Sequence, residues 1–378
     1  MRVAFHAPMK APDDPVPSGE GRMARLFMEA IRRAGCEVEL ASRFRAYEGA
    51  GDAGRQREIA AEGAREAERL VARYRALRQA ERPALWFTYH LYHKAPDHLG
   101  PAVAGALGIP YVVAEASHAP KQRNGRWAAG YHAAESAIRL ADRIWCINPV
   151  DRACLLPIAK PGALRDLPPF IDTAPFRAGD RATARRWADA AFGLDPDAPL
   201  ILTVAMMRAD QKLESYRVLA DALGRVEKRR WNALVVGDGP AEAEVRRSMQ
   251  PLGGRVAFAG RLTGDDLVRA YRAADIYAWP SVKEAVGMSF IEAASAGVAV
   301  VAGRSGGIDH VVEDGRTGLV VPAGDAAVLA EGIAVLLDDP ARAHRMGEAG
   351  AARAVEVNDV EAAARMLAAD IRQLVAAR

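Results

Sequence analysis

The chain has 378 residues and a formal net charge of +3, with 50% hydrophobic and 26% charged residues. This length predicts about two domains, each with its own core, and the composition excludes a disordered chain. Three scattered cysteines show no metal-ligand spacing and indicate a reducing compartment, and no apolar run reaches the ~20 residues that span a bilayer. Because MRVAFHAP also lacks a signal-peptide pattern, we expect a cytoplasmic protein.

The charge is distributed unevenly along the chain. Residues 1–170 contain 25 Lys and Arg against 19 Asp and Glu, whereas residues 171–378 contain 26 against 29. A basic first half favours an anionic partner, either a phospholipid surface at the inner face of the membrane or a phosphorylated acceptor. A solvated surface is the alternative, since residues 55–82 mix Arg with Glu at helical spacing. No nucleic-acid partner is expected.

Apolar runs alternate with helical patterns in both halves of the chain. In the first half we expect a helix over Gly21 to Ala34 and strands at 3–8, 36–42, 84–90, 111–118 and 143–148. In the second half the apolar runs predict strands at 200–207, 233–239, 255–260, 275–281, 298–303 and 318–324. Such alternation predicts parallel sheets covered on both faces, with ligands beyond the carboxyl ends of the strands. The proline-rich stretch from Pro157 to Pro175 is the expected linker.

The segment from Ser281 to Asp325 carries the most specific pattern. Glu284 and Glu292 stand eight positions apart, the first in a loop after a strand and the second in a short helix that Gly297 ends. Between them, Gly287 permits close backbone approach, and the first free amides of the helix follow. Because a helix N-terminus binds anions, this segment suits a ligand with a phosphate and several hydroxyls.

This segment resembles the E-x7-E region of retaining glycosyltransferases of family 4, which have the GT-B fold. Four further segments resemble the family in the same order along the chain, at 167–177, 205–212, 234–240 and 306–325. The resemblance covers roughly the C-terminal half. It implies two Rossmann-like doubly wound domains facing across a cleft, at 1–170 and 171–358. It also implies that a last helix, within 359–378, packs back on the N-terminal domain.

The resemblance also implies a donor site for a nucleotide-diphosphate sugar. We expect no metal bound by a D-x-D pair at this site. Arg208 and Lys212 would instead neutralise the leaving diphosphate. Glu292 would accept from the ribose hydroxyls and Glu284 from hydroxyls of the transferred sugar. The remaining expected donor contacts are Gly19, Arg261, Val286, Gly287, Met288 and Ser289. Solvated cations and ordinary helix glutamates are the structural alternatives.

The N-terminal half offers weaker candidates. Gly19 aligns with the family's glycine-rich loop, where helix capping by Ser18 is the competing account. His118, which closes a predicted strand, matches a family histidine near the donor sugar and is counted as catalytic, although a structural role is equally expected. His90 and His93 are candidates for the acceptor side. Lys121, Arg123 and Arg126 fit either an acidic acceptor or a solvated loop.

The predicted function is transfer of a hexose, with retention, from a UDP-, GDP- or ADP-sugar to a glycan, lipid or small-molecule acceptor. The family implies a front-face mechanism, in which the departing phosphate oxygen takes the acceptor's proton. No cofactor is expected, because the nucleotide sugar is the substrate. Two alternatives stay open: a nucleotide-sugar epimerase on the same fold, and a sugar-nucleotide sensor without turnover.

Overall fold

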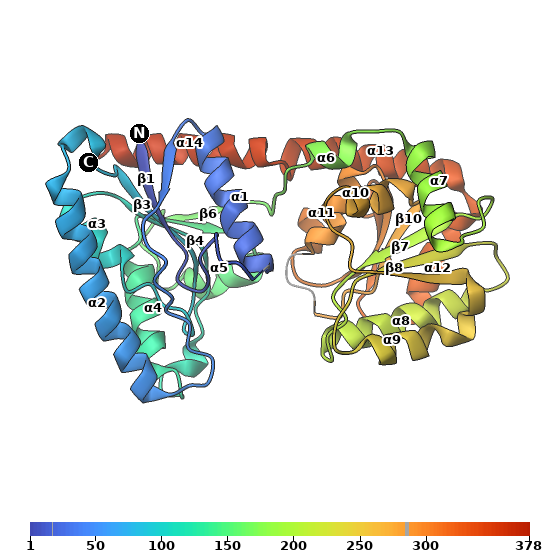
Figure 1. The fold of residues 1–378 in the computed structure, drawn as a ribbon, viewed down its shortest axis with the longest axis horizontal. Helices are drawn as coiled ribbons and strands as arrows, with labels where there is room; N and C mark the ends of the chain where they lie inside the picture. The colour runs from blue at the N-terminus through green and yellow to red at the C-terminus, as the bar shows by residue number, and fades with distance from the viewer. Residues whose placement is uncertain (17, 284–286) are drawn as a thin grey trace. The chain divides into compact units, whose positions relative to one another are not determined.

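A computed structural model describes residues 1–16, 18–283 and 287–378. The chain forms two compact units: unit 1 comprises Met1–Pro168 and Val360–Arg378, and unit 2 comprises Pro169–Asp359. Each unit contains a six-stranded parallel sheet flanked by helices (Figure 1). None of the helices in the described part of the chain is both long and apolar enough to cross a bilayer.

The sheet of unit 1 has the strand order β2-β1-β3-β4-β5-β6, and all neighbouring strands are parallel. The strands are β1 (Arg2–His6), β2 (Glu37–Leu40), β3 (Leu85–Leu91), β4 (Tyr111–Ala116), β5 (Arg143–Cys146) and β6 (Leu164–Asp166). Strands β1 and β3 to β5 are almost continuously buried, as expected for parallel strands with helices on both faces.

The helices of unit 1 are α1 (Gly19–Arg33), α2 (Ala53–Ala76), α3 (Gly100–Leu107), α4 (Ala128–Leu140), α5 (Pro149–Leu155) and α14 (Val360–Ala376), with short 3₁₀ turns η1 (Gln79–Glu81) and η2 (Pro120–Gln122). Helix α1 packs against α14, and α2 packs against α3 and α4 (Figure 1). The last helix of the chain therefore completes the unit that contains the first strand.

A buried ion pair joins α14 to the sheet of unit 1. Arg143, on β5, has a side chain only 5% exposed, and its Nε lies 3.0 Å from Oδ2 of Asp370 on α14. The indole N–H of Trp145 donates to the same carboxylate at 3.1 Å. The Asp370 carboxylate therefore contacts two side chains of β5, those of Arg143 and Trp145.

Unit 2 repeats the architecture with the strand order β12-β11-β10-β7-β8-β9, again entirely parallel. The strands are β7 (Leu200–Val204), β8 (Asn232–Val236), β9 (Val256–Gly260), β10 (Ile276–Trp279), β11 (Ala299–Arg304) and β12 (Gly318–Pro322). The helices are α6 (Ala174–Arg177), α7 (Arg181–Phe192), α8 (Gln211–Arg225), α9 (Glu242–Met249), α10 (Gly264–Ala273), α11 (Met288–Ser295), α12 (Ala326–Asp338) and α13 (Pro340–Val357), with 3₁₀ turns η3 (Gln250–Arg255) and η4 (Ile308–His310).

The predicted fold class, two doubly wound α/β sheets, is confirmed, and the facing of the two units across a cleft stays a prediction. The prediction missed one strand. Within the proline-rich stretch expected to be a linker, Leu164–Asp166 forms β6 and pairs with β5. Only Leu164 of this strand is buried, so it lacks the apolar run that signals a strand. Its pairing depends on β5, which is distant in sequence.

The Asp370 contacts generate a stability prediction. We expect Asp370→Ala to lower the free energy of unfolding by about 1.5–3 kcal/mol, the range for hydrogen bonds to a charged group, because Arg143 is left buried without its carboxylate. Arg365→Ala, at an exposed position of the same helix, should change it by less than about 0.5 kcal/mol. Urea denaturation of the full chain measures both values. Equal effects of the two substitutions would contradict this account of how α14 is held.

Candidate functional site

The carboxyl edge of the unit 2 sheet gathers the loops that follow β7, β8 and β10. The amide of Met207, after β7, donates to the carbonyl of Asp238, after β8, at 2.8 Å. A Cβ on Gly237 would lie 1.9 Å from the carbonyl oxygen of Ala205, and the φ of +143° at Gly237 also disfavours other residues. Glycine at this position therefore lets the two loops lie against each other.

The two predicted phosphate-binding cations lie at the start of α8. Asp210 caps this helix by accepting from the amide of Lys212 at 2.9 Å, and its carboxylate also lies 3.0 Å from Nε of Arg208. Nζ of Lys212 lies 5.3 Å from the ring centroid of Trp279, the last residue of β10. The structure thus brings Arg208 and Lys212 to one loop-helix junction. The contribution of Trp279 was not predicted.

The N-terminus of α11 lies beside this junction. The hydroxyl of Tyr277, on β10, is 2.7 Å from Oγ of Ser289 and 3.3 Å from the carbonyl oxygen of Val204, where β7 ends. Gly287 has φ +67°, and a Cβ there would lie 2.5 Å from Cδ2 of Phe290. Met288 begins the helix, so the first free amides of α11 lie near the loop that carries Arg208. Glu284 and Val286 lie outside the described residues.

The other two predicted donor contacts in unit 2, Glu292 and Arg261, lie in different surroundings. Glu292 is only 3% exposed, and its Oε2 accepts from the hydroxyl of Tyr271 on α10 at 2.7 Å. Arg261 is exposed and follows β9, the outer strand of the sheet, two positions from β7. The structure therefore gives Glu292 a partner inside the protein. Its predicted contact with ribose stays a prediction, as does the role of Arg261.

At the carboxyl edge of the unit 1 sheet, Ser18 caps α1 by accepting from the amide of Gly21 at 3.1 Å. Among the described residues, nothing lies within 4 Å of a Cβ built on Gly19. The capping role of Ser18 is therefore observed, and Gly19 has an open backbone that a ligand can approach.

A cluster of titratable side chains lies at the same edge. Oε2 of Glu20, on α1, lies 2.6 Å from Nδ1 of His90, the penultimate residue of β3, which has the uncommon φ of +59°. Glu115, near the end of β4, has φ +58°, and burial raises the pKa of its carboxyl. Burial likewise raises the pKa of Asp151 on α5. Non-glycine residues with positive φ cost energy and gather at functional sites. The sequence singled out His90 but not these carboxylates.

The proton equilibria of the Glu20–His90 pair follow from this geometry. Burial of His90 acts to lower its pKa, but the Glu20 hydrogen bond and the charges of Glu115, Glu20 and Asp151 outweigh it and raise the pKa of the imidazole. The pKa of Glu20 is lowered, because the hydrogen bond and charge of His90 outweigh its burial. An imidazolium–carboxylate pair therefore persists between these two pKa values.

His118 is engaged by the protein at both ring nitrogens. Nε2 lies 2.9 Å from the hydroxyl of Tyr131, and Nδ1 lies 3.2 Å from the carbonyl oxygen of Cys154. The ring is buried and packs against that of Tyr131. These contacts give His118 a structural role, which the sequence analysis considered as the alternative to catalysis. The catalytic role of His118 stays a prediction.

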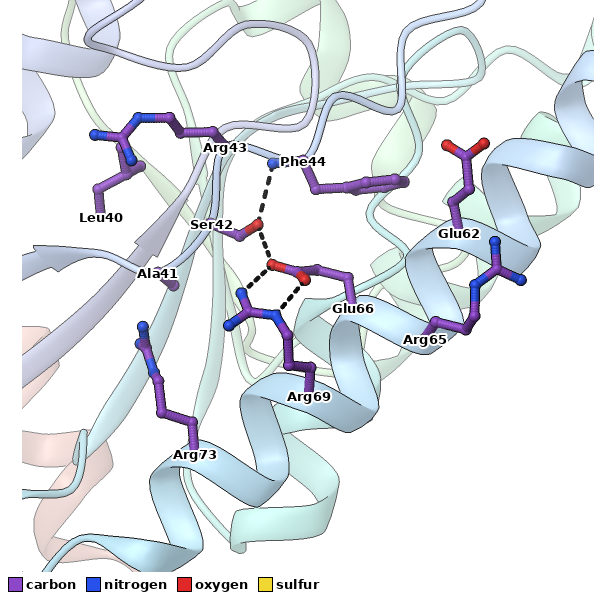
Figure 2. Close-up of a pocket in the computed structure, with 10 residues that line it drawn as sticks. All are labelled: Leu40, Ala41, Ser42, Arg43, Phe44, Glu62, Arg65, Glu66, Arg69 and Arg73. Carbon is purple, nitrogen blue, oxygen red and sulfur yellow. Dashed lines mark hydrogen bonds and ion pairs between the residues drawn. The ribbon is translucent and has the colours of Figure 1, made fainter.

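A separate cavity of about 630 Å³ opens between the residues after β2 and helix α2. Figure 2 shows that Arg69 binds both carboxylate oxygens of Glu66 and that Ser42 donates to the same carboxylate. Two more arginines of the lining are ion-paired, Arg43 with Asp13 and Arg73 with Glu39. Its positive charge is thus largely offset by carboxylates of the protein.

Residues 198–339, within unit 2, match the family described as "Glycosyl transferases group 1". The chain belongs to this family. It is 36% identical over 202 residues to D-inositol 3-phosphate glycosyltransferase of Nocardia farcinica, covering 49% of this chain and 43% of the relative. It is 34% identical over 200 residues to GDP-mannose-dependent alpha-(1-6)-phosphatidylinositol monomannoside mannosyltransferase of Mycolicibacterium smegmatis, covering 50% of each.

The chain spans about half the length of the curated relatives it matches. Among solved structures, sucrose-phosphate synthase of Thermosynechococcus elongatus is similar over the full length of both chains, with a TM-score of 0.75 and 24% identity. This similarity establishes the GT-B fold.

The Glu20–His90 pair predicts a specific pH dependence. Its stabilising contribution requires charged Glu20, so it is lost as pH falls through the lowered pKa of Glu20. It also requires protonated His90, so it is complete below the ordinary histidine value of 6.5 and is lost as pH rises through the raised pKa of His90. We therefore expect Glu20→Gln to destabilise the chain most at pH values between the two pKa values, and progressively less as pH rises above the raised pKa of His90.

NMR titration of the His90 imidazole checks the cause directly. The pKa of His90 should fall in Glu20→Gln and stay unchanged in Glu29→Gln, at the exposed side of the same helix. An unchanged His90 pKa in Glu20→Gln would show that the pair does not set the titration.

Proposed function

We propose that the chain is a retaining hexosyltransferase that takes its sugar from a nucleoside diphosphate. The observation that supports the proposal is that Arg208, Lys212 and the α11 N-terminus all lie at the carboxyl edge of the unit 2 sheet. The name of the mycobacterial relative specifies GDP-mannose as a requirement of that protein, which supports a nucleotide-sugar donor here. The acceptor is a glycan, a lipid or a small molecule.

The geometry suits departure of a diphosphate. Cleavage of the sugar–phosphate bond leaves additional negative charge on the β-phosphate, and preorganised positive groups lower the barrier by stabilising it. Arg208 offers a planar fork of donors, Lys212 a point charge, and the first amides of α11 further donors. In the proposed front-face reaction, the bond from the anomeric carbon to the phosphate oxygen breaks while the acceptor oxygen bonds to the same face. The departing oxygen takes the acceptor's proton.

The two glutamates divide the donor between them in this proposal. Glu292 accepts from the ribose hydroxyls once a donor is bound, which requires its carboxylate to share or exchange the hydroxyl of Tyr271. Glu284 accepts from hydroxyls of the transferred sugar, and Val286 contributes its amide. No metal takes part, since cations and amides stabilise the leaving group. An epimerase or a sensor on the same fold would also bind the nucleotide, and product analysis with and without acceptors separates these functions.

Lys212 provides the direct test. Lys212→Ala should lower turnover by on the order of 10²-fold, as expected for loss of one preorganised charge, and should weaken binding of UDP or GDP. Lys228→Ala is the matched control, because Lys228 is exposed at the opposite, amino end of β8. Thermal shift measures binding, since a diphosphate at 100 times its Kd stabilises the protein by about 2.7 kcal/mol. Normal turnover in Lys212→Ala would refute the assignment of this lysine.

Metal removal tests the leaving-group chemistry. Treatment with EDTA should leave the turnover of the wild-type chain largely intact, because the positive charge comes from side chains and amides. The measurement is transfer activity before and after chelation, with Mg²⁺ or Mn²⁺ added back. Complete loss that either ion restores would mean that a metal, and not Arg208 and Lys212, carries the charge.

A further inference from the structure

Three segments of unit 1 meet around Trp127 at the carboxyl edge of its sheet. The indole N–H of Trp127 donates to the carbonyl of Glu48 at 3.0 Å. Gln56, on α2, donates to the carbonyl of Arg126 at 2.8 Å and accepts from the amide of Gly130 at 3.1 Å. These hydrogen bonds therefore fix the loop after β4 to α2 and to the loop that precedes α2.

Cationic side chains gather on this fixed frame. Nζ of Lys94, in the loop after β3, lies 4.5 Å from the ring centroid of Trp127, and Cζ of Arg126 lies 5.9 Å from it. The imidazole of His93 contacts the same indole edge to face, at 5.7 Å between ring centroids. Lys121 lies in the turn η2, in the same loop after β4 that carries Arg126. We call Lys94, Lys121, Arg126 and His93 the cationic patch.

Among the described residues, the Lys and Arg side chains of the patch lack the carboxylate partners that several other arginines of unit 1 have. In the part of the chain that the structure describes, Lys94, Lys121 and Arg126 form no ion pair with a carboxylate. By contrast, Arg123, in the same loop, lies 3.6 Å from the carboxylate of Glu135. Three of the arginines that line the cavity of Figure 2 are also ion-paired with carboxylates.

The carboxylate of Glu48, the residue whose carbonyl accepts from Trp127, is already bound within its own loop. Both carboxylate oxygens of Glu48 accept from backbone amides of its own loop, from Ala50 and from Gly51, each at 2.7 Å. Burial, followed by the charges of Lys94 and Lys121, lowers the pKa of His93. An arriving anion would relieve that repulsion without displacing a carboxylate of the protein.

The surroundings favour a single anionic group over an extended anionic surface. Ring contacts run from His93 to Tyr92, at 5.3 Å, and from Tyr92 to His90, at 5.0 Å. His90 belongs to the cluster that contains Glu20 and Glu115, so carboxylates adjoin the patch. Lys94 and Arg126 lie against one indole ring, so one phosphate group can contact both cations.

We propose that the cationic patch binds the phosphate group of a soluble phosphorylated acceptor, a step that rests on the proposed glycosyltransferase function. A phosphate ester offers three acceptor oxygens, which match the donors of one guanidinium and two ammonium groups. The hydroxyls of the same acceptor then face the Glu20–His90 cluster. The patch thereby selects acceptors by charge, independently of the donor on unit 2.

Binding of inorganic phosphate to the full chain, without nucleotide, is the first test. NMR titration should shift the imidazole signals of His93, assigned with His93→Gln, and should raise its pKa as the anion offsets Lys94 and Lys121. Lys94→Ala, Lys121→Ala and Arg126→Ala should each weaken binding by about 10-fold or more. Arg78→Ala is the control, because it removes one positive charge from an exposed ion pair of the same unit. Equal thermal transitions of the variants verify folding.

Equal phosphate binding by all variants, or an absent His93 response, overturns the proposal. The donor assignment is judged separately, because a thermal shift with UDP or GDP that persists in Lys94→Ala leaves it intact. If the chain responds to neither phosphate nor nucleotide, both proposals fail.

The second test separates the two sources of phosphate. Vesicles of phosphatidylcholine, with and without phosphatidylglycerol, are sedimented with the wild-type chain and with Lys94→Ala. Membrane binding that requires both phosphatidylglycerol and Lys94 overturns the assignment to a soluble acceptor. Transfer assays compare a polyol with its phosphate ester as acceptor. Lys94→Ala should raise KM for the ester about 10-fold and leave kcat for the ester and KM for the polyol unchanged. If Lys94→Ala prefers the ester over the polyol as strongly as the wild-type chain does, the proposed phosphate site is also overturned.

Discussion

Parallel strand pairing is the constraint on which every candidate site of this protein depends. Because all strands of a sheet run in one direction, the loops that leave their carboxyl ends emerge at one edge, however distant they are in sequence. In unit 2 this brings the Arg208 loop, after β7, to the same edge as the start of α11, after β10. In unit 1 it brings Glu20, His90 and Glu115 together from three separate segments.

Close approach of these loops imposes its own requirements on the sequence. The Ala205 carbonyl lies where any side chain at Gly237 would have to be, and Gly287 takes a conformation that other residues adopt at a cost. Polar side chains then connect neighbouring loops, as Ser215 does by accepting from the amide of Val282 at 3.1 Å. Cations and helix amides are thereby fixed before any ligand arrives, which is the condition for electrostatic stabilisation of a leaving group.

The sequence predicted the features that depend on local patterns, namely buried strands and helix starts. Buried strands appeared as apolar runs, and the start of α11 was predicted from Gly287 and the residues that follow it. Local patterns could not predict contacts between residues that are distant in sequence. No local signal indicates that Glu135 pairs with Arg123 while Lys121 lacks a carboxylate among the described residues, or that Tyr131 engages His118. Similarly, β6 is too short and too exposed to be recognised without the strand beside it.

The packing of α14 against α1 has a consequence for biosynthesis. Most of unit 1 leaves the ribosome before unit 2, yet the helix that packs against α1 begins only at Val360, after all of unit 2 has been translated. A nascent chain can fold unit 2 as one continuous segment, whereas its first unit must wait with part of an apolar helix face uncovered. Chaperones that bind exposed apolar surface therefore have their longest opportunity at α1, and a ribosome that stalls before Val360 leaves that face open.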